Sequence, residues 1–210
     1  SASAAEERVV IDNVVYGLTE DKTYGQHYAV RDFMADETLA ETTTKIKIVD
    51  EIDDIEVMGI NTNYSDNEDF ASYEYTQQYP SVKKISMPTT IKYLGDYAFT
   101  FFPSVEKLQL PAELETMGEG TFYSMDSLKS ITLPEGIIEV REYAFKNCVN
   151  LEKVVFQGDL LGVREHAFMN CEKLSSVKFP DSLKSIDSAA FYGTAFKKIV
   201  LPAGVNLTED

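Results

Sequence analysis

Cysteine and histidine are the residue types with the widest chemical repertoire, and this chain has only two of each. Cys148 and Cys171 lie 23 positions apart. Two cysteines alone do not make a metal site, because a structural zinc ion needs four ligands. They could form a disulfide if their Cα atoms lie close together, or they could remain buried thiols. Both states stay open at this point.

The two histidines, His27 and His166, have no recognisable catalytic partners. Glu165 precedes His166, but a nucleophile and its base must meet across the fold, and no spacing marks such a triad. The sequence has no glycine-rich phosphate loop, zinc-protease helix or nucleophile elbow. Acidic residues are abundant, so spacing alone leaves a glycosidase-type carboxylate pair open. Because no feature predicts an enclosed cleft, we expect no enzyme, cofactor or metal site.

Calcium could be considered at Asp66-Asn67-Glu68-Asp69, where several oxygen ligands lie together. The spacing does not match a calcium loop, which alternates its oxygen ligands and contains a glycine. We therefore favour a solvated loop there.

The elements that position all of these residues repeat with a period of 23. Five phenylalanines have this spacing, each preceded by Ala or Thr: Phe99, Phe122, Phe145, Phe168 and Phe191. A fixed period between 20 and 50 residues indicates a solenoid, in which each unit must stack on the next to bury its apolar face.

Each unit starts with the pattern L-x-x-I-x-L, as in Leu128, Ile131 and Leu133. The pattern predicts short strands in a parallel sheet with neighbours about 4.8 Å apart, in which the last two apolar residues point inward. A proline then ends the ladder, as at Pro134. We place each Ala-Phe pair in a single helical turn on the convex side, with the phenylalanines as its spine.

This stacking puts Cys148 and Cys171 in one column, where parallel side chains favour buried, reduced thiols over a disulfide. It also puts His166 in the column of Tyr143, on which we expect it to stack.

The repeat resembles the bacterial BspA-like leucine-rich repeats, whose units run roughly C-x-x-L-x-x-I-x-L-P-x-x-L-x-x-I-G-x-x-A-F-x-x-C. The match covers about residues 80–202 well and 44–60 loosely, with local departures at Arg141, Arg164 and Asp187, where glycine is usual. We therefore expect an α/β-class leucine-rich-repeat solenoid, mostly β with short helical turns: a right-handed parallel-sheet stack behind a β-rich N-terminal cap. The resemblance implies a bacterial or protist surface or secreted protein with an adhesive or protein-binding role and no catalytic residues.

The net charge differs between the part of the chain before the regular repeats and the repeats themselves. Residues 1–79 hold 18 acidic and 5 basic residues, whereas 80–210 hold 17 and 14. With a net charge of −16, nucleic acid is not an expected partner, because its binding depends on Lys and Arg at phosphates. The sequence contains no run of 18 apolar residues, so it predicts no membrane span. The first seven residues, SASAAEE, lack the basic and apolar regions of a signal peptide. They are equally compatible with the residues left after removal of a leader and with the start of a cytosolic protein.

We predict a cap over residues 1–79 and an array of 23-residue units over 80–210. In the cap, residues 9–16 read as a β-hairpin around Asp12-Asn13, with a third strand through 28–30. Residues 31–44 read as a short helix or a loop. Residues 44–60 read as a degenerate first repeat, in which Ile46 and Ile48 match the repeat strand and Met58-Gly59 matches Leu94-Gly95. An insertion at about 61–79 is rich in tyrosines and acids. We favour a solvated loop whose tyrosines pack on the cap, and the alternative is a contact surface with Tyr73 and Tyr75 as candidate residues.

The outward strand positions of the array are the remaining candidate site. Twelve such positions hold five lysines and no acid, in a strongly acidic protein. Lysine is also common on solvated strands, where it discourages edge pairing. The candidate partner-binding residues are Lys84, Lys107, Gln109, Thr132, Lys153, Val155, Lys178, Lys198, Tyr73 and Tyr75.

We predict a non-catalytic, extracellular or cell-surface module that recognises a protein partner, possibly an acidic one, through this ribbon. The alternatives are a glycan-binding module, in which exposed tyrosines stack on sugar rings, and a structural spacer of a larger envelope protein.

Overall fold

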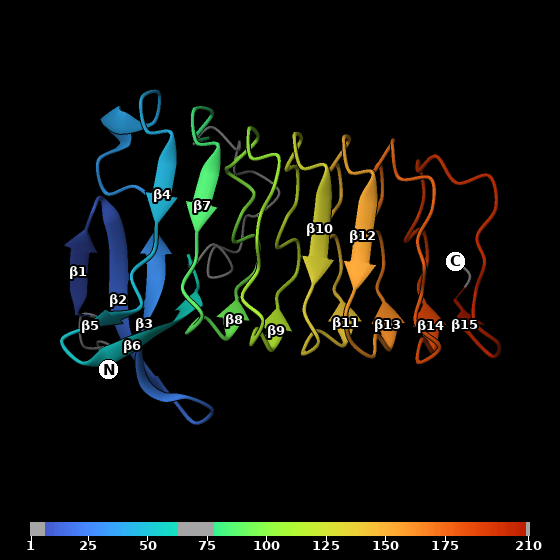
Figure 1. The fold of residues 1–210 in the computed structure, drawn as a ribbon, viewed down its shortest axis with the longest axis horizontal. Helices are drawn as coiled ribbons and strands as arrows, with labels where there is room; N and C mark the ends of the chain where they lie inside the picture. Colours follow the sequence, from blue (N-terminus) through green and yellow to red (C-terminus); the bar gives the residue numbers. More distant parts are fainter. Residues whose placement is uncertain (1–6, 63–77, 209–210) are drawn as a thin grey trace, which may run out of the picture.

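The chain begins with three antiparallel strands, which close one end of an elongated stack of repeats (Figure 1). The computed structural model describes residues 7–62 and 78–208. Strand β1 (Arg8–Ile11) pairs with β2 (Val14–Asp21), and β2 pairs with β3 (Gly25–Asp32). Asp12 and Asn13 have φ angles of 49° and 69°, which are typical of the primed turns that match strand twist. The predicted hairpin and third strand are confirmed.

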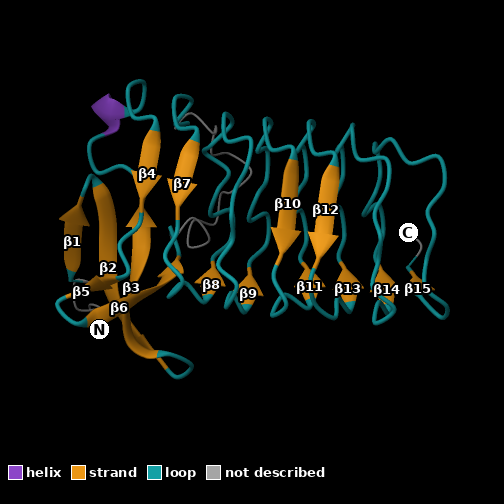
Figure 2. Cartoon of the chain, viewed as in Figure 1, coloured by secondary structure: helices purple, strands orange, loops and turns teal. Residues whose placement is uncertain are grey.

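The segment predicted as a short helix or a loop contains both. A 3₁₀ helix, η1, covers Glu37–Leu39, and the side chain of Asp36 caps it by accepting a hydrogen bond from the amide of Thr38. It is the only helix in the described part of the chain, and Figure 2 shows it beside β4.

The segment predicted as a degenerate first repeat pairs with the array at two places, and one of these pairings differs from the predicted alignment. Strand β4 (Lys45–Lys47) pairs in parallel with β7 (Lys84–Ser86), which places Ile46 opposite Ile85 as expected. The match of Met58-Gly59 to Leu94-Gly95 is wrong, because Ile60 pairs with Leu94. A tight hairpin of β5 (Glu51–Ile52) and β6 (Ile55–Ile60) replaces the usual turn and shifts the register.

The register places Gly59 against the ring of Tyr93, and a Cβ at Gly59 would collide with that ring. A glycine is therefore needed at Gly59 for a packing reason specific to the cap, which the repeat pattern does not carry.

The array has two rows of parallel strands that run in opposite directions (Figure 1). The first row follows the predicted pattern, with β4, β7, β10 (Ser130–Leu133) and β12 (Lys153–Phe156). The second row was expected only as an apolar column. It consists of β8 (Tyr93–Leu94), β9 (Thr116–Met117), β11 (Glu139–Val140), β13 (Gly162–Val163), β14 (Ser185–Ile186) and β15 (Asn206–Leu207).

Both rows are interrupted. In the first row β4 pairs with β7 and β10 with β12, and between these pairs Lys107 makes a single bridge to Ser130. Strands predicted at 107–110 and 176–179 are therefore not continuous ladder strands, although their inward residues Leu108 and Phe179 are buried. The second row divides between β9 and β11. Parallel stacking is confirmed, and the right-handed sense stays a prediction.

The predicted helical turns around each Ala-Phe pair are wrong: these segments are hydrogen-bonded turns. The amides of Tyr143, Phe145 and Asn147 donate to carbonyls of the next repeat, at 3.2, 2.7 and 2.9 Å. The amides between them reach back three residues within their own repeat, as Lys146 does to Tyr143. An α-helix uses its amides internally, so this alternating arrangement excludes it.

Two left-handed positions accompany these turns in each repeat except the first, where Tyr97 is the only one. Tyr143 (φ 58°) and Asn147 (φ 64°) are one pair, and their counterparts recur at intervals of 23 residues. The counterparts are Tyr97, Gly120, His166 and Ala189 in one column, and Ser124, Asn170 and Gly193 in the other.

The phenylalanine spine is confirmed. Successive rings from Phe99 to Phe191 are stacked at centroid distances of 5.8, 4.9, 5.1 and 5.2 Å. Phe99, Phe122, Phe145 and Phe168 have no exposed surface. One hydrophobic core runs from the cap strands through the array. The boundary at residues 79 and 80 stays a prediction.

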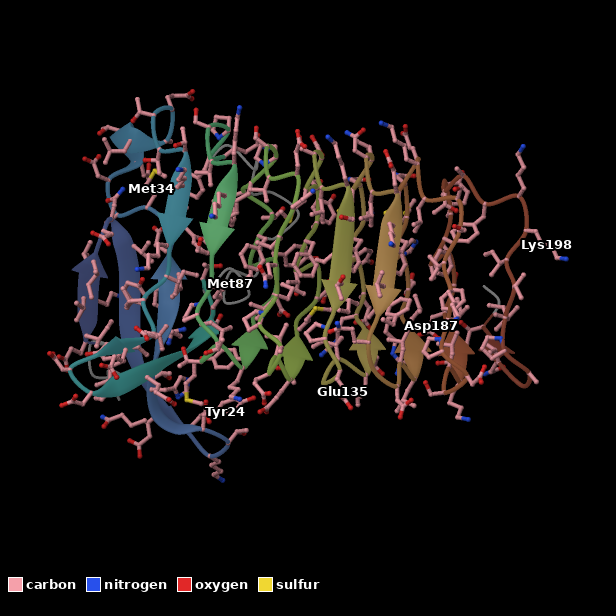
Figure 3. The ribbon with its side chains drawn as sticks, in the orientation of Figure 1. Tyr24, Met34, Met87, Glu135, Asp187 and Lys198 are labelled. Carbon is pink, nitrogen blue, oxygen red and sulfur yellow. The ribbon has the colours of Figure 1, made fainter. Side chains whose placement is uncertain are left out.

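A clamp formed by the β2–β3 hairpin fastens the cap to the array. Tyr24 stacks on Tyr93 at 5.5 Å and donates a hydrogen bond to the Glu115 carboxylate at 3.1 Å. His27 is fully buried, and its Nε2 lies 2.9 Å from the Tyr93 hydroxyl. Burial and the Glu115 hydrogen bond raise the pKa of Tyr24 to about 12. Figure 3 labels Tyr24 at the hairpin end of the cap.

Candidate binding surface on the first strand row

The outward positions of the first strand row form the candidate surface, which we call the lysine face. Its charged members among the predicted residues, all exposed, are Lys84, Lys107, Lys153, Lys178 and Lys198. Gln109 and Thr132 are also exposed, whereas Val155 is half-buried. Figure 3 shows Lys198 extending from the C-terminal end. Tyr73 and Tyr75 lie outside the described residues.

Strand pairing aligns neighbouring members of the lysine face. Ser130 lies opposite Lys153, and Thr132 lies opposite Val155, in the β10–β12 ladder. Side chains at paired positions of adjacent strands point to the same side of the sheet. The ladder therefore gathers residues 23 positions apart onto one surface.

The sequence analysis missed two members of this face, Lys45 and Lys47. Both are exposed on β4, and Lys45 pairs with Lys84. The alignment of Ile46 and Ile48 with the repeat strand could have identified them, because the residues flanking Ile46 must then point outward. The face thus continues into the cap, although the cap as a whole is acidic.

A row of alternating charges borders the lysine face on the N-terminal side of the strands. It consists of Lys83, Glu106, Lys129 and Glu152, all of which are exposed. Lys129 Nζ lies 2.7 Å from Glu106 Oε2. This hydrogen bond lowers the pKa of Glu106 and raises the pKa of Lys129. Glu106 is thus already paired by a neighbouring repeat, which leaves Lys84 and Lys107 beside it.

The lysine face is hollowed where the first strand row is interrupted. A groove of about 990 Å³ lies between β7 and residues 107–112. A second hollow of about 560 Å³ adjoins it toward β10, and the two share Lys107, Gln109, Leu110 and Ala112. This part of the lysine face is therefore both recessed and positively charged. Figure 3 labels Met87, which lines the groove beyond the end of β7.

The second strand row carries charge of both signs. Arg164 forms ion pairs with Glu139, in the preceding repeat, and with Asp187 at 3.3 Å in the following repeat. The hydrogen bond that Arg164 donates to the Glu139 carboxylate is the main reason that the pKa of Arg164 is raised. Arg164 and Asp187, which stand where glycine is usual, thus link three turns of the array together with Glu139.

The cysteines are reduced and buried, as favoured from the sequence. Each thiol donates a hydrogen bond to a carbonyl of the preceding repeat, Cys148 to Phe122 and Cys171 to Phe145, both at 3.1 Å. Burial raises the pKa of Cys148 well above its usual range and the pKa of Cys171 to about 12. Since the thiolate is the reactive species, these groups are suited to packing rather than to nucleophilic chemistry.

Among the remaining candidates from the sequence, His166 takes part in packing. His166 stacks on Tyr143 at 5.3 Å with nearly parallel rings, as predicted. Over residues 7–62 and 78–208, no cluster of three or more His, Cys, Asp or Glu side chains is placed to hold a metal ion. No helix in those ranges is long and apolar enough to cross a bilayer.

The repeat columns and the parallel strand rows agree with a comparison to known families. The model of the BspA type leucine rich repeat region, with six copies, matches residues 68–194 and 138–210. This chain belongs to the BspA-type leucine-rich repeat family. Leucine-rich repeats are generally non-enzymatic protein-interaction modules, and the resemblance drawn from the sequence is confirmed.

Solved structures show the same fold. A leucine-rich repeat protein from Eubacterium ventriosum is 24% identical, with a TM-score of 0.67 over 94% of this chain and 46% of that protein. One from Bacteroides ovatus is 21% identical, with a TM-score of 0.64 over 95% and 55%. A leucine rich cell surface protein from Faecalibacterium prausnitzii is 18% identical, with a TM-score of 0.57 over 98% and 51%.

This BspA-type chain spans about half the length of those three proteins. Among curated proteins, no sequence matches it.

Proposed function

We propose that this BspA-type leucine-rich repeat protein is a non-catalytic cell-surface or secreted module that recognises an acidic region of another protein through its lysine face. The observation that carries the proposal is the alignment of exposed lysines, from Lys45 and Lys84 to Lys153, on one side of the first strand row. The twelve array positions of this face include no acidic residue, in a chain of net charge −16.

Electrostatics explains why such an arrangement favours an acidic partner. A surface of one sign accelerates the encounter with a surface of the opposite sign and disfavours partners of like charge. The acidic remainder of the chain repels acidic partners elsewhere, so productive encounters concentrate on the lysine face. The cell-surface location is supported by the description of the Faecalibacterium prausnitzii relative as a cell surface protein.

Glycan binding and a spacer role stay alternatives from the sequence. The glycan alternative depends on the exposure of Tyr73 and Tyr75, which lie outside the described residues.

The experiment compares the full chain with two charge-matched variants. Lys107→Glu with Lys153→Glu reverses two members of the lysine face, whereas Lys22→Glu with Lys184→Glu reverses two exposed lysines elsewhere. Binding to immobilised synthetic peptides of graded negative charge is measured by biolayer interferometry, at low and at high salt. We expect binding to increase with peptide charge, to weaken at high salt, and to be lost only in the lysine-face variant. Equal loss in both variants, or binding that persists after reversal of the lysine face, would overturn the proposal.

A further inference from the structure

The groove between β7 and residues 107–112 exists because two neighbouring repeats do not pair. Strand β7 pairs with β4 on its other side, and Lys107 makes its one bridge to Ser130. Elsewhere in this row, β10 and β12 pair over four residues. The interruption therefore creates a recess of about 990 Å³ in the lysine face.

The lining of this groove changes character along the strand direction. At the N-terminal end of the strands it is cationic, with Lys83, Lys84 and Lys107. Gln109 occupies the middle of the groove. At the C-terminal end the lining is apolar and consists of Met87, Leu110, Pro111 and Ala112.

The cationic end is not neutralised by its one acidic neighbour. Glu106 also lines the groove, but its carboxylate is 2.7 Å from the ammonium group of Lys129. An anionic group entering the groove would thus meet three lysines around a carboxylate that is already paired. This arrangement favours a negatively charged group at that end.

We propose that this groove binds an extended peptide segment that carries acidic residues followed by a large apolar side chain. The acids would lie at Lys84 and Lys107, and the apolar side chain would occupy the end formed by Met87, Leu110 and Ala112. The proposal rests on the proposed function, because it assigns a particular ligand class and position to the same lysine face.

The dimensions of the groove set the spacing within the peptide. Lys84 and Met87 are three residues apart along a strand direction, or roughly 10 Å at about 3.3 Å per residue. An extended peptide has the same rise, and its side chains alternate between faces. The acidic and apolar residues that enter the groove together are therefore two or four residues apart.

The probes are three fluorescent octapeptides, and the readout is anisotropy with the full chain. The first has two glutamates at alternate positions and a leucine two residues after the second of them, so that all three side chains lie on one face of the extended peptide. The second has serine in place of leucine, and the third has glutamines in place of both glutamates. We expect the first to bind about tenfold more tightly than the second, from burial of the leucine. The third should bind more weakly than the first and should lose most of its salt dependence.

One substitution separates the apolar end of the groove from the charge of the lysine face. Ala112 is exposed in the turn after Pro111, and Ala203 is exposed at the matching place after Pro202. Ala112→Lys fills the apolar end with an ammonium group while adding attraction for acids, and Ala203→Lys adds the same charge outside the groove. We expect Ala112→Lys to abolish the preference for the leucine peptide over the serine peptide, and Ala203→Lys to retain it.

The outcomes distinguish the two proposals. If the first two peptides bind equally, or if Ala112→Lys retains the leucine preference, the groove proposal is wrong. The lysine face then still stands, provided that binding depends on the glutamates and on Lys107 and Lys153. If the glutamates and those lysines have no effect, the proposed function fails, and the groove proposal fails with it.

Discussion

The side of the array that carries the Ala-Phe turns, which we call the turn side, differs from the side of the lysine face in how regularly neighbouring repeats are joined. On the turn side, backbone hydrogen bonds link every repeat from Tyr97 to Tyr192, and the phenylalanine rings stack behind them. On the side of the lysine face, the ladder is interrupted beside β7 and again after β12. The comparison indicates that the turn side holds the repeats together, which leaves the other side free to open a groove. The predictions below test this division of roles.

Truncation of the phenylalanine spine should have the largest effect. Phe145 has no exposed surface and lies between Phe122 at 4.9 Å and Phe168 at 5.1 Å. We expect Phe145→Ala to lower the free energy of unfolding by about 3–5 kcal/mol, because it leaves a cavity. On the other side, Thr132→Ala at an exposed position should change it by less than about 0.5 kcal/mol. Urea denaturation measures both, and similar losses in the two variants would contradict the division of roles.

The cysteines should report how tightly the turn side is closed. With the pKa of Cys171 raised to about 12 by burial, its thiolate population near pH 8 is roughly a thousandfold below that of an ordinary cysteine. We expect a chromogenic disulfide reagent to label neither cysteine in the folded chain and both in urea. Rapid labelling of the folded chain would show that the turn side opens easily.

Hydrogen exchange compares the two sides directly. The amides of Phe145 and Asn147 bond to the next repeat, whereas Gln109 and Leu110 lie in the interrupted part of the first strand row. We expect slower exchange at Phe145 and Asn147, by about tenfold or more if their opening costs at least about 1.4 kcal/mol more. Mass spectrometry of peptides covering 105–112 and 141–149 measures this difference. Equal protection would mean that the interruption does not loosen the sheet.

Removal of the Tyr24 hydroxyl from the clamp of the β2–β3 hairpin should have the smallest effect. This change tests the junction of cap and array. Tyr24→Phe removes the hydrogen bond to Glu115 and should cost about 0.5–1.5 kcal/mol at neutral pH. The pKa of Tyr24 is about 12 when folded and near 10 when unfolded. Its contribution is therefore complete below pH 10 and is lost as the pH rises toward 12, because the unfolded chain releases the proton first.

The measurement is thermal unfolding of the wild-type and Tyr24→Phe chains between pH 8 and the onset of alkaline unfolding. The difference between the two chains should shrink as the pH rises above 10. A constant difference would contradict the assignment of this pH dependence to Tyr24.

Much of the array could be predicted from the sequence because the residues that define each repeat lie within that repeat. Identical residue types recur every 23 positions, so the inward columns of Phe145 and Ile131 and the outward position of Lys153 follow from spacing alone. The stacking of His166 on Tyr143 follows for the same reason. Errors arose where the pattern leaves the hydrogen bonding open. An Ala-Phe turn is compatible with a helix until the amides are seen to donate to the next repeat.

The groove and the junction with the cap were decided by contacts between distant segments. Whether β7 pairs with residues 107–110 depends on how whole repeats pack, and each of the two segments has the same apolar spacing as its paired counterparts. The pairing of Ile60 with Leu94 depends on an intervening hairpin whose length no repeat specifies.

The sequence by itself thus determined the columns of the array, its lysines and the buried state of its cysteines. Burial at a period of 23 is a property of each repeat and is visible in its own residues. Only the tertiary structure decided where neighbouring repeats separate, and so where the lysine face becomes a groove. Strand pairing is a relation between segments, and it depends on the side chains and register of both.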